Sequence, residues 1–252
     1  KHTKMKKALF NWSGGKDSAL CLHKVLTSGD YQVSHLITTL NKEKGRISMH
    51  GVREELLDLQ AERLGLPLHK IQLPDRVSMK EYDRIMSEAL DSFGRKVTHS
   101  VFGDIFLEDL RKYREQRLTK AGIEALFPLW KQSTDNLAQE FINSGFKAVV
   151  VCTDGRKLDR SFVGREYNRQ FLKDLPPDID PCGENGEFHT FVYDGPIFRK
   201  PVLFKYGDVV KCAYTVNSGD QSSCRSSISG ALPEVSSHQF WFCDFTVDEQ
   251  VR

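Results

Sequence analysis

Short apolar runs alternate with amphipathic stretches along the first 155 residues of the chain. A buried strand is expected at 8–10, and apolar side chains at helical spacing predict a helix from 19 to 26. The same patterns predict further strands at 31–40, 68–73, 97–105, 123–129 and 146–152, and helices at 56–64, 78–93, 107–121 and 133–143. This alternation indicates an α/β fold, with a doubly wound parallel sheet over residues 5–155. The run at 146–152 is almost wholly apolar, so we expect it to be buried on both faces of that sheet.

The pattern changes beyond residue 154. Residues 156–173 are polar with an expected helix around 164–172, and the prolines at 176–181 exclude regular structure. Strands are expected at 188–193, 201–203, 208–216 and 240–247, with a long Ser/Gly-rich loop over 217–237. These features predict a smaller C-terminal α+β domain over residues 156–252.

The turn between the first strand and the first helix carries the clearest chemistry. We call residues 13–18 the glycine loop: Ser13, Gly14, Gly15, Lys16, Asp17 and Ser18. The two glycines let backbone N–H groups approach an anion, and the helix that follows adds its positive dipole end. The serines add hydroxyl donors, Lys16 adds a cation, and Asp17 suits a helix cap or a Mg²⁺ ligand. We therefore predict a phosphate or pyrophosphate site instead of a plain capped turn.

Composition narrows the class of protein. The formal net charge of +2 does not favour a nucleic-acid partner, and no apolar run approaches the roughly 20 residues of a membrane helix. The 6 cysteines form no C-x-x-C pair, which favours reduced cytoplasmic thiols over a disulfide framework, a zinc site or an iron–sulfur cluster.

Candidate ligands also lie where other predicted strands end. Thr38 should lie beside the glycine loop, because ligands of parallel sheets bind at the carboxyl ends of the strands. His50 and Arg53 follow on the same side, as nucleotide or substrate contacts or as a plain helix-entry turn. Gly103 and Asp104 end the fourth strand, where the acid is a candidate for substrate or Mg²⁺ contact or for a helix N-cap.

A second dense motif, which we call the acid loop, covers residues 180–187 and leads into the strand at 188–193. Its three carboxylates, two glycines and asparagine favour binding of an amine, ammonium or metal over a set of exposed turns. The candidate binding residues are Gly183, Glu184, Asn185, Gly186, Glu187 and His189. Cys182 has no activating neighbour in the sequence and is expected to be structural.

Together these motifs resemble the diphthine–ammonia ligase (diphthamide synthase, ATP-binding) family of the PP-loop ATP pyrophosphatase superfamily. The resemblance rests on the glycine loop, on Gly103-Asp104 and on Gly-Glu-Asn-Gly-Glu-Phe-His-Thr followed by Val-Tyr-Asp-Gly-Pro, and it covers about residue 7 to beyond 201. It implies a HUP-like domain and Mg²⁺-ATP cleaved between the α- and β-phosphates. It also implies that AMP is transferred to a carboxylate of the acceptor and that ammonia then converts this acyl-adenylate to an amide. Asn185 and His189 depart from the family pattern, which is closer to glycine and an acid, and leave the acceptor open.

The resulting role assignments are expectations. The catalytic candidates are Lys16, Asp17, Asp104, Glu184 and Glu187; ATP is expected to contact residues 13–18, Thr38 and His50, with Asp17 on the metal. Gly103, Asp104 and the acid-loop residues are expected to bind the acceptor, which is elongation factor 2 in its diphthine form or a small carboxylate. A homodimer stays open. The alternatives are a PP-loop enzyme that adenylates a tRNA base or the oxygen of a small molecule, and a non-catalytic adenine-nucleotide-binding protein.

Overall fold

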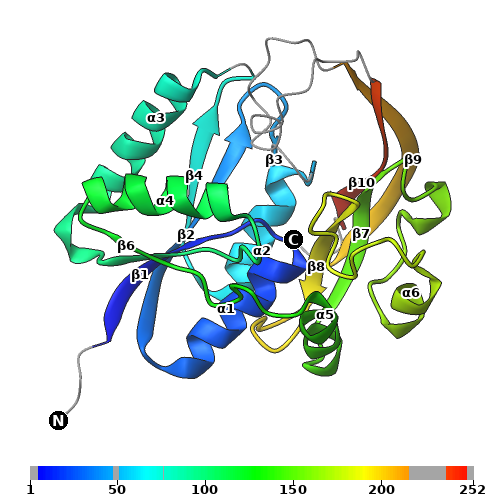
Figure 1. Ribbon diagram of the computed structural model, residues 1–252, viewed down its shortest axis with the longest axis horizontal. Helices are drawn as coiled ribbons and strands as arrows, with labels where there is room; N and C mark the ends of the chain where they lie inside the picture. Colours follow the sequence, from blue (N-terminus) through cyan, green and yellow to red (C-terminus); the bar gives the residue numbers. More distant parts are fainter. Residues whose placement is uncertain (1–4, 48–50, 76, 216–236, 249–252) are drawn as a thin grey trace.

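The computed structural model describes residues 5–47, 51–75, 77–215 and 237–248, which form two sheets (Figure 1). Sheet A has the order β3-β2-β1-β5-β6, and β4 pairs with β2. Its strands are β1 (Lys6–Asn11), β2 (Tyr31–Asn41), β3 (Arg46–Ile47), β4 (Leu68–Leu73), β5 (His99–Val101) and β6 (Glu124–Leu126). All pair in parallel except β3, which is antiparallel to β2.

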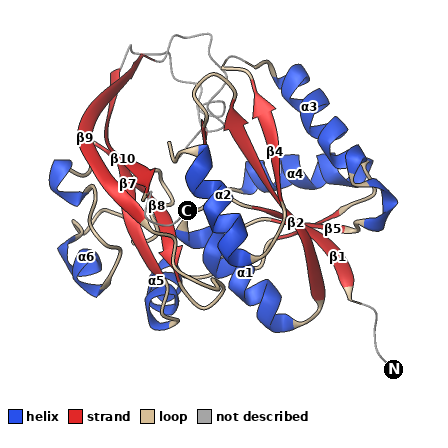
Figure 2. Cartoon of the chain, turned by 180° about the vertical axis from the view of Figure 1, so that it is seen from behind, coloured by secondary structure: helices blue, strands red, loops and turns tan. Residues whose placement is uncertain are grey.

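Helices cover both faces of sheet A, as the unbroken burial of Ala8, Leu9 and Phe10 in β1 requires. Leu9 packs with Ile37 against one helical layer, while Ala8 and Phe10 point to the opposite layer. Figure 2 shows α3 and α4 on the first face and α1 and α2 on the second, between sheet A and sheet B. These helices are α1 (Lys16–Ser28), α2 (Glu54–Leu64), α3 (Met79–Ser92) and α4 (Glu108–Lys120). The doubly wound arrangement is therefore confirmed.

Sheet B is antiparallel with the order β8-β7-β10-β9. Its strands are β7 (Lys147–Asp154), β8 (Phe188–Asp194), β9 (Phe204–Thr215) and β10 (Ser237–Val247), accompanied by α5 (Thr134–Asn143) and α6 (Arg169–Asp174). Single-turn 3-10 helices occupy Gly94–Lys96 and Arg160–Phe162. The apolar side chains of sheet B, α1 and α2 belong to one continuous core.

Three expectations about the C-terminal part need correction. The strand expected at 146–152 in the parallel sheet is β7, which pairs with β8 and β10 in sheet B. A strand that is apolar on both faces fits either sheet, so its pattern could not identify its partners. The strand expected at 201–203 is absent, since these residues are irregular; the strand expected at 208–216 begins earlier, as β9, and the helix expected around 164–172 is only α6. The loop expected at 217–237 lies almost wholly outside the described residues. A domain boundary near residue 155 stays a prediction.

Among the described residues, every helix is too short or too polar to cross a membrane.

Candidate functional site

The glycine loop joins the end of β1 to the start of α1. Gly14 has φ = 76°, a conformation that favours glycine, and a Cβ there would lie 2.8 Å from the side-chain oxygen of Gln60. Gly15 is the N-cap of α1 and brings no side-chain cap. Ser13 Oγ donates to Ser18 Oγ (3.1 Å), which donates to the Gly15 carbonyl (2.9 Å). The N–H of Lys16 is bonded to Thr190 Oγ1 of β8, but among the described residues no side chain caps the next two N–H groups of α1, those of Asp17 and Ser18, which leaves them to an anion.

Gln60 of α2 ties this loop to the rest of the fold. Its side chain is fully buried and accepts a hydrogen bond from Trp12 Nε1 at 2.9 Å. Its Nε2 donates to the carbonyl oxygens of Gly14 (3.0 Å) and Val192 (2.6 Å). The sequence analysis missed Gln60, although a polar residue between the leucines of an amphipathic helix was an available signal.

Two backbone groups of the glycine loop bond directly to β8 of sheet B. Val192 N donates to the Gly14 carbonyl at 2.9 Å, and Lys16 N donates to Thr190 Oγ1 at 3.1 Å. Thr190 is buried and follows the acid loop by three residues. The two sequence motifs therefore meet, although more than 160 residues of chain separate them.

Lys16 points into this junction. Its ammonium donates to both oxygens of Asp17 (2.9 and 2.7 Å) and to the carbonyl oxygen of Cys182. The rings of Tyr167 and Phe188 lie 5.8 and 5.6 Å from the nitrogen. Burial, the largest single effect, would lower the pKa of Lys16, but the charge and hydrogen bond of Asp17, together with Cys182 and the charge of Glu184, outweigh burial and hold the pKa above its ordinary value. Lys16 is therefore a charged group inside the protein, joined to the acid loop.

Asp180 organises the acid loop. Its Oδ1 accepts from the backbone N–H groups of Cys182 (2.8 Å) and Glu184 (3.3 Å), and its Oδ2 accepts from Thr134 Oγ1 (2.7 Å) at the start of α5. Gly183 has φ = 69°, and a Cβ there would lie 2.8 Å from a backbone carbonyl oxygen. Burial raises the pKa of the Cys182 thiol, so this cysteine is not an activated nucleophile.

Glu187 is held from several sides. Its side chain is completely buried. One oxygen accepts from Asn185 N (2.9 Å), and the other accepts from Asn185 Nδ2 (3.0 Å) and Lys157 Nζ (3.3 Å). Burial would raise the pKa of Glu187, but the hydrogen bonds from Asn185 and Lys157 keep it below the ordinary value. Glu184 is only partly buried, and its charge acts on Lys16.

Gly103 and Asp104 bring the end of β5 against the start of α1. A Cβ on Gly103 would lie 3.2 Å from the Asp17 carbonyl oxygen and 3.3 Å from Ser18 Cα. Arg114 Nη1 lies 2.7 Å from Asp104 Oδ2, an ion pair without hydrogen-bond geometry. Burial raises the pKa of Asp104, Arg114 opposes the rise, and the charge of Asp17 adds to it.

The two acids at this end of sheet A fit Mg²⁺. The described residues contain no group of three or more His, Cys, Asp or Glu side chains placed to hold a metal. Mg²⁺ needs only one or two carboxylates when phosphates and water supply its other ligands. Asp104 Oδ2 is buried without a hydrogen-bond partner, and the neighbouring Asp17 is 30% exposed.

The remaining residues that the sequence analysis predicted make no direct hydrogen bond to the glycine loop among the described contacts. Thr38 is buried in β2, next to Ile37, whose carbonyl oxygen accepts from Trp12 N at 2.8 Å. His189 lies on β8 opposite Cys152. Arg53 forms an ion pair with Asp244 of β10. His50 lies outside the described residues.

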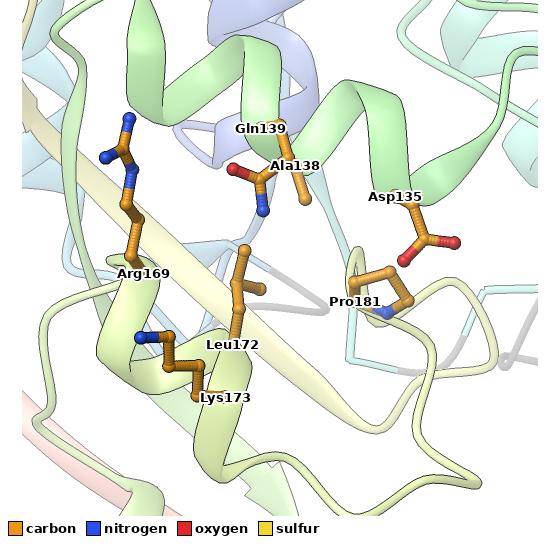
Figure 3. A pocket seen from close by; sticks show the side chains of 7 residues that line it. All are labelled: Asp135, Ala138, Gln139, Arg169, Leu172, Lys173 and Pro181. Atoms are coloured by element: carbon orange, nitrogen blue, oxygen red, sulfur yellow. The ribbon is translucent and has the colours of Figure 1, made fainter.

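A groove of about 350 Å³ runs between α5 and α6, next to the acid loop (Figure 3). It is lined by Asp135, Ala138, Gln139, Arg169, Leu172, Lys173 and Pro181. Pro181 belongs to the acid loop, so the groove borders that loop directly. The Pro181 carbonyl accepts a hydrogen bond from Tyr167 Oη at 2.7 Å. The lining includes none of the glycine-loop residues.

Two family profiles match the chain. Residues 5–125 match the diphthamide synthase N-terminal domain, and residues 133–214 match the diphthamide synthase C-terminal domain. Curated relatives named diphthine–ammonia ligase include proteins of Homo sapiens, 22% identical over 222 residues, and Danio rerio, 24% identical over 227 residues. These alignments cover 79% of this chain and 82% and 86% of the relatives.

The namesake of Schizosaccharomyces pombe is 24% identical over 220 residues, and the match covers 79% of this chain but only 36% of that relative's length. The two profiles together span most of the chain and contain both the glycine loop and the acid loop. The chain therefore belongs to the diphthamide synthase family.

Proposed function

We propose that this protein is an ATP-dependent, AMP-forming ligase that adenylates a carboxylate and then converts it to an amide with ammonia. One observation carries the proposal: the glycine loop, built to hold phosphates, is bonded directly to β8 and to the acid loop. A nucleotide held at the first and an acceptor held at the second meet at one junction. The names of the curated relatives support the same chemistry.

The nucleotide side uses backbone groups more than side chains. The N–H groups of Asp17 and Ser18 and the dipole of α1 would bind the phosphates; the hydroxyls of Ser13 and Ser18, which donate within the glycine loop, stay predicted ATP contacts. Asp17 and Asp104 would hold Mg²⁺, which neutralises charge on the departing pyrophosphate when bound. Thr38 and His50 stay predicted ATP contacts. Catalysis at this step is mainly positioning and electrostatic stabilisation.

The reaction has two balanced steps. An oxygen of the acceptor carboxylate attacks the α-phosphorus, a new P–O bond forms, and the bond to the departing pyrophosphate breaks. The nitrogen of ammonia then attacks the acyl carbon, AMP leaves with the former carboxylate oxygen, and a base takes the released proton. We assign the base to Glu184, whose carboxylate is only partly buried, while Glu187 keeps the acid loop in shape.

We propose diphthine on elongation factor 2 as the acceptor, because diphthine stands in the names of the relatives. A small carboxylate is the second candidate, favoured by the departure of Asn185 in the acid loop and His189 on β8 from the family pattern. The groove beside Pro181 (Figure 3) offers a surface for a macromolecular acceptor next to the loop.

The test is a product assay with purified protein, Mg²⁺-ATP, an ammonium salt and diphthine-bearing elongation factor 2. We expect AMP and pyrophosphate in equal amounts, together with the acid-to-amide mass change on the acceptor. Glu184→Gln should spare adenylation and slow amidation. ADP and phosphate as products would refute the mechanism, and ATP binding without products from any carboxylate would favour the non-catalytic alternative.

A further inference from the structure

Lys16 occupies the position in the glycine loop where a phosphate-binding lysine would be expected, yet its ammonium is bonded to other groups of the protein. The ammonium has three protons to donate. It lies against both oxygens of Asp17 and the carbonyl oxygen of Cys182. The side chain of Lys16 is only 6% exposed. These three acceptors match the three N–H protons of the Lys16 ammonium, so all of its hydrogen bonds are made within the protein.

Turning Lys16 toward a phosphate would be costly. It would leave the buried Cys182 carbonyl without this donor and separate the Lys16 ammonium from the Asp17 carboxylate. A buried polar group that loses its partner costs about 1–3 kcal/mol, and a charged one costs more. The phosphates have other donors, namely the N–H groups of Asp17 and Ser18 in the first turn of α1, whereas the hydroxyls of Ser13 and Ser18 already donate within the glycine loop.

The far end of this contact is the acid loop itself. The Cys182 carbonyl is preceded by Pro181, whose own carbonyl accepts from Tyr167 Oη. On the other side, Asp180 bonds the N–H groups of Cys182 and Glu184. The backbone that carries Glu184 is therefore fixed at one carbonyl by Lys16, and Lys16 N is also bonded to Thr190.

We propose that Lys16 is a positioning residue that couples the glycine loop to the acid loop and does not contact the phosphates. Nucleotide binding that shifts the start of α1 then moves the Cys182 carbonyl, and with it Glu184. This inference rests on the proposed function for the identity of the acceptor and needs only ATP to be tested.

The test compares wild-type protein with Lys16→Met, which keeps the length and apolar stem. ATP affinity is measured with a fluorescent ATP analogue, and amide hydrogen exchange is followed over residues 182–187. We expect ATP affinity to change by less than about fivefold, because its phosphate contacts remain. A lost charge-assisted phosphate contact would instead weaken binding by roughly 10- to 100-fold. Exchange over residues 182–187 should become faster, and the change that ATP causes there should disappear.

Lys157→Met is the matched control. Lys157 also bonds the acid loop, through Glu187, but no hydrogen bond joins it to the glycine loop among the described residues. This variant should loosen the loop near Glu187 while the effect of ATP on residues 182–184 persists. A large loss of ATP affinity in Lys16→Met, with unchanged exchange in the acid loop, would overturn the proposal.

A measurement on wild-type protein covers the case in which Lys16→Met does not fold. Amine acetylation should leave Lys16 unmodified with and without ATP, while Lys131, which is 62% exposed, reacts. Labelling of Lys16 that ATP prevents would contradict the inference. Failure to bind ATP at all would refute the proposed function, and the faster exchange in Lys16→Met would still test the link between the loops.

Discussion

Replacing Gln60 with leucine should loosen the glycine loop without touching a residue assigned to the chemistry. The Gln60 side chain is fully buried and makes three hydrogen bonds, to Trp12 Nε1, the Gly14 carbonyl and the Val192 carbonyl. Leucine has a similar volume and no polar atom, so the substitution removes the bonds while leaving little cavity.

The expected loss of stability is about 3 kcal/mol. Each neutral hydrogen bond contributes about 0.5–1.5 kcal/mol net, and a buried donor left unpaired costs about 1–3 kcal/mol. Trp12 Nε1 loses its acceptor, whereas the Gly14 carbonyl keeps the bond from Val192 N at 2.9 Å. The effect should therefore fall below the sum of three independent losses, yet remain a large part of the 5–15 kcal/mol typical of a domain.

Urea denaturation followed by tryptophan fluorescence measures the loss, and the fluorescent ATP analogue measures the consequence for the loop. Gln139→Leu is the matched control, because Gln139 is exposed on α5 and a change there should stay within about 0.5 kcal/mol. We expect Gln60→Leu to weaken ATP binding as well as stability. A loss below about 1 kcal/mol with unchanged ATP affinity would show that Gln60 does not support the loop.

Three further predictions concern other contacts. The hydrogen bond from Arg53, aided by Arg46 against the effect of burial, lowers the pKa of Asp244 to about 2. Its stabilisation is therefore present above pH 4 and lost as the pH falls toward 2. Asp244→Asn should cost about 1 kcal/mol at pH 7 after allowance for solvent screening, and only a small part of that at pH 2, in urea denaturation. Gly103→Ala should cost about 1–3 kcal/mol and weaken ATP binding, because its Cβ would press on backbone atoms of Asp17 and Ser18; an unchanged melting temperature would contradict the close packing. Asn185→Gly, which removes the side-chain bond to Glu187, should slow amidation more than adenylation in a product assay, and equal effects on both steps would argue against its role in the acid loop.

The helices and strands that could be predicted from the sequence are those whose hydrophobic pattern fits only one type of secondary structure in one position of the fold. The β2 and β4 strands and the α3 helix have clear period-two or helical spacing, and the structure places them within a residue or so of the predicted ends. The prediction for the strand at 146–152 was wrong about its partners. This strand is apolar on both faces, so its sequence indicates burial but does not indicate which strands pair with it. Pairing in sheet B depends on contacts between distant segments, which periodicity does not contain.

The candidate site likewise combines features that the sequence could predict with contacts that it could not. The residue types of the glycine loop and acid loop pointed to an anion and an acceptor, since their chemistry is local. The contacts that join the loops were invisible because the partners are far apart: Gln60 lies 132 residues from Val192, and Lys16 lies 166 residues from Cys182. Sequence also could not give the direction of the Lys16 side chain, which the buried acceptors around it decide.

The most direct measurement follows a heavy oxygen isotope from the acceptor carboxylate. Diphthine-bearing elongation factor 2, labelled in that carboxylate, is incubated with the protein, Mg²⁺-ATP and an ammonium salt, and the AMP is analysed by mass spectrometry. If the carboxylate is adenylated before ammonia attacks, each amide formed must be accompanied by one AMP that carries the heavy oxygen. Amide formation with unlabelled AMP, or with label in inorganic phosphate alongside ADP, would contradict the account.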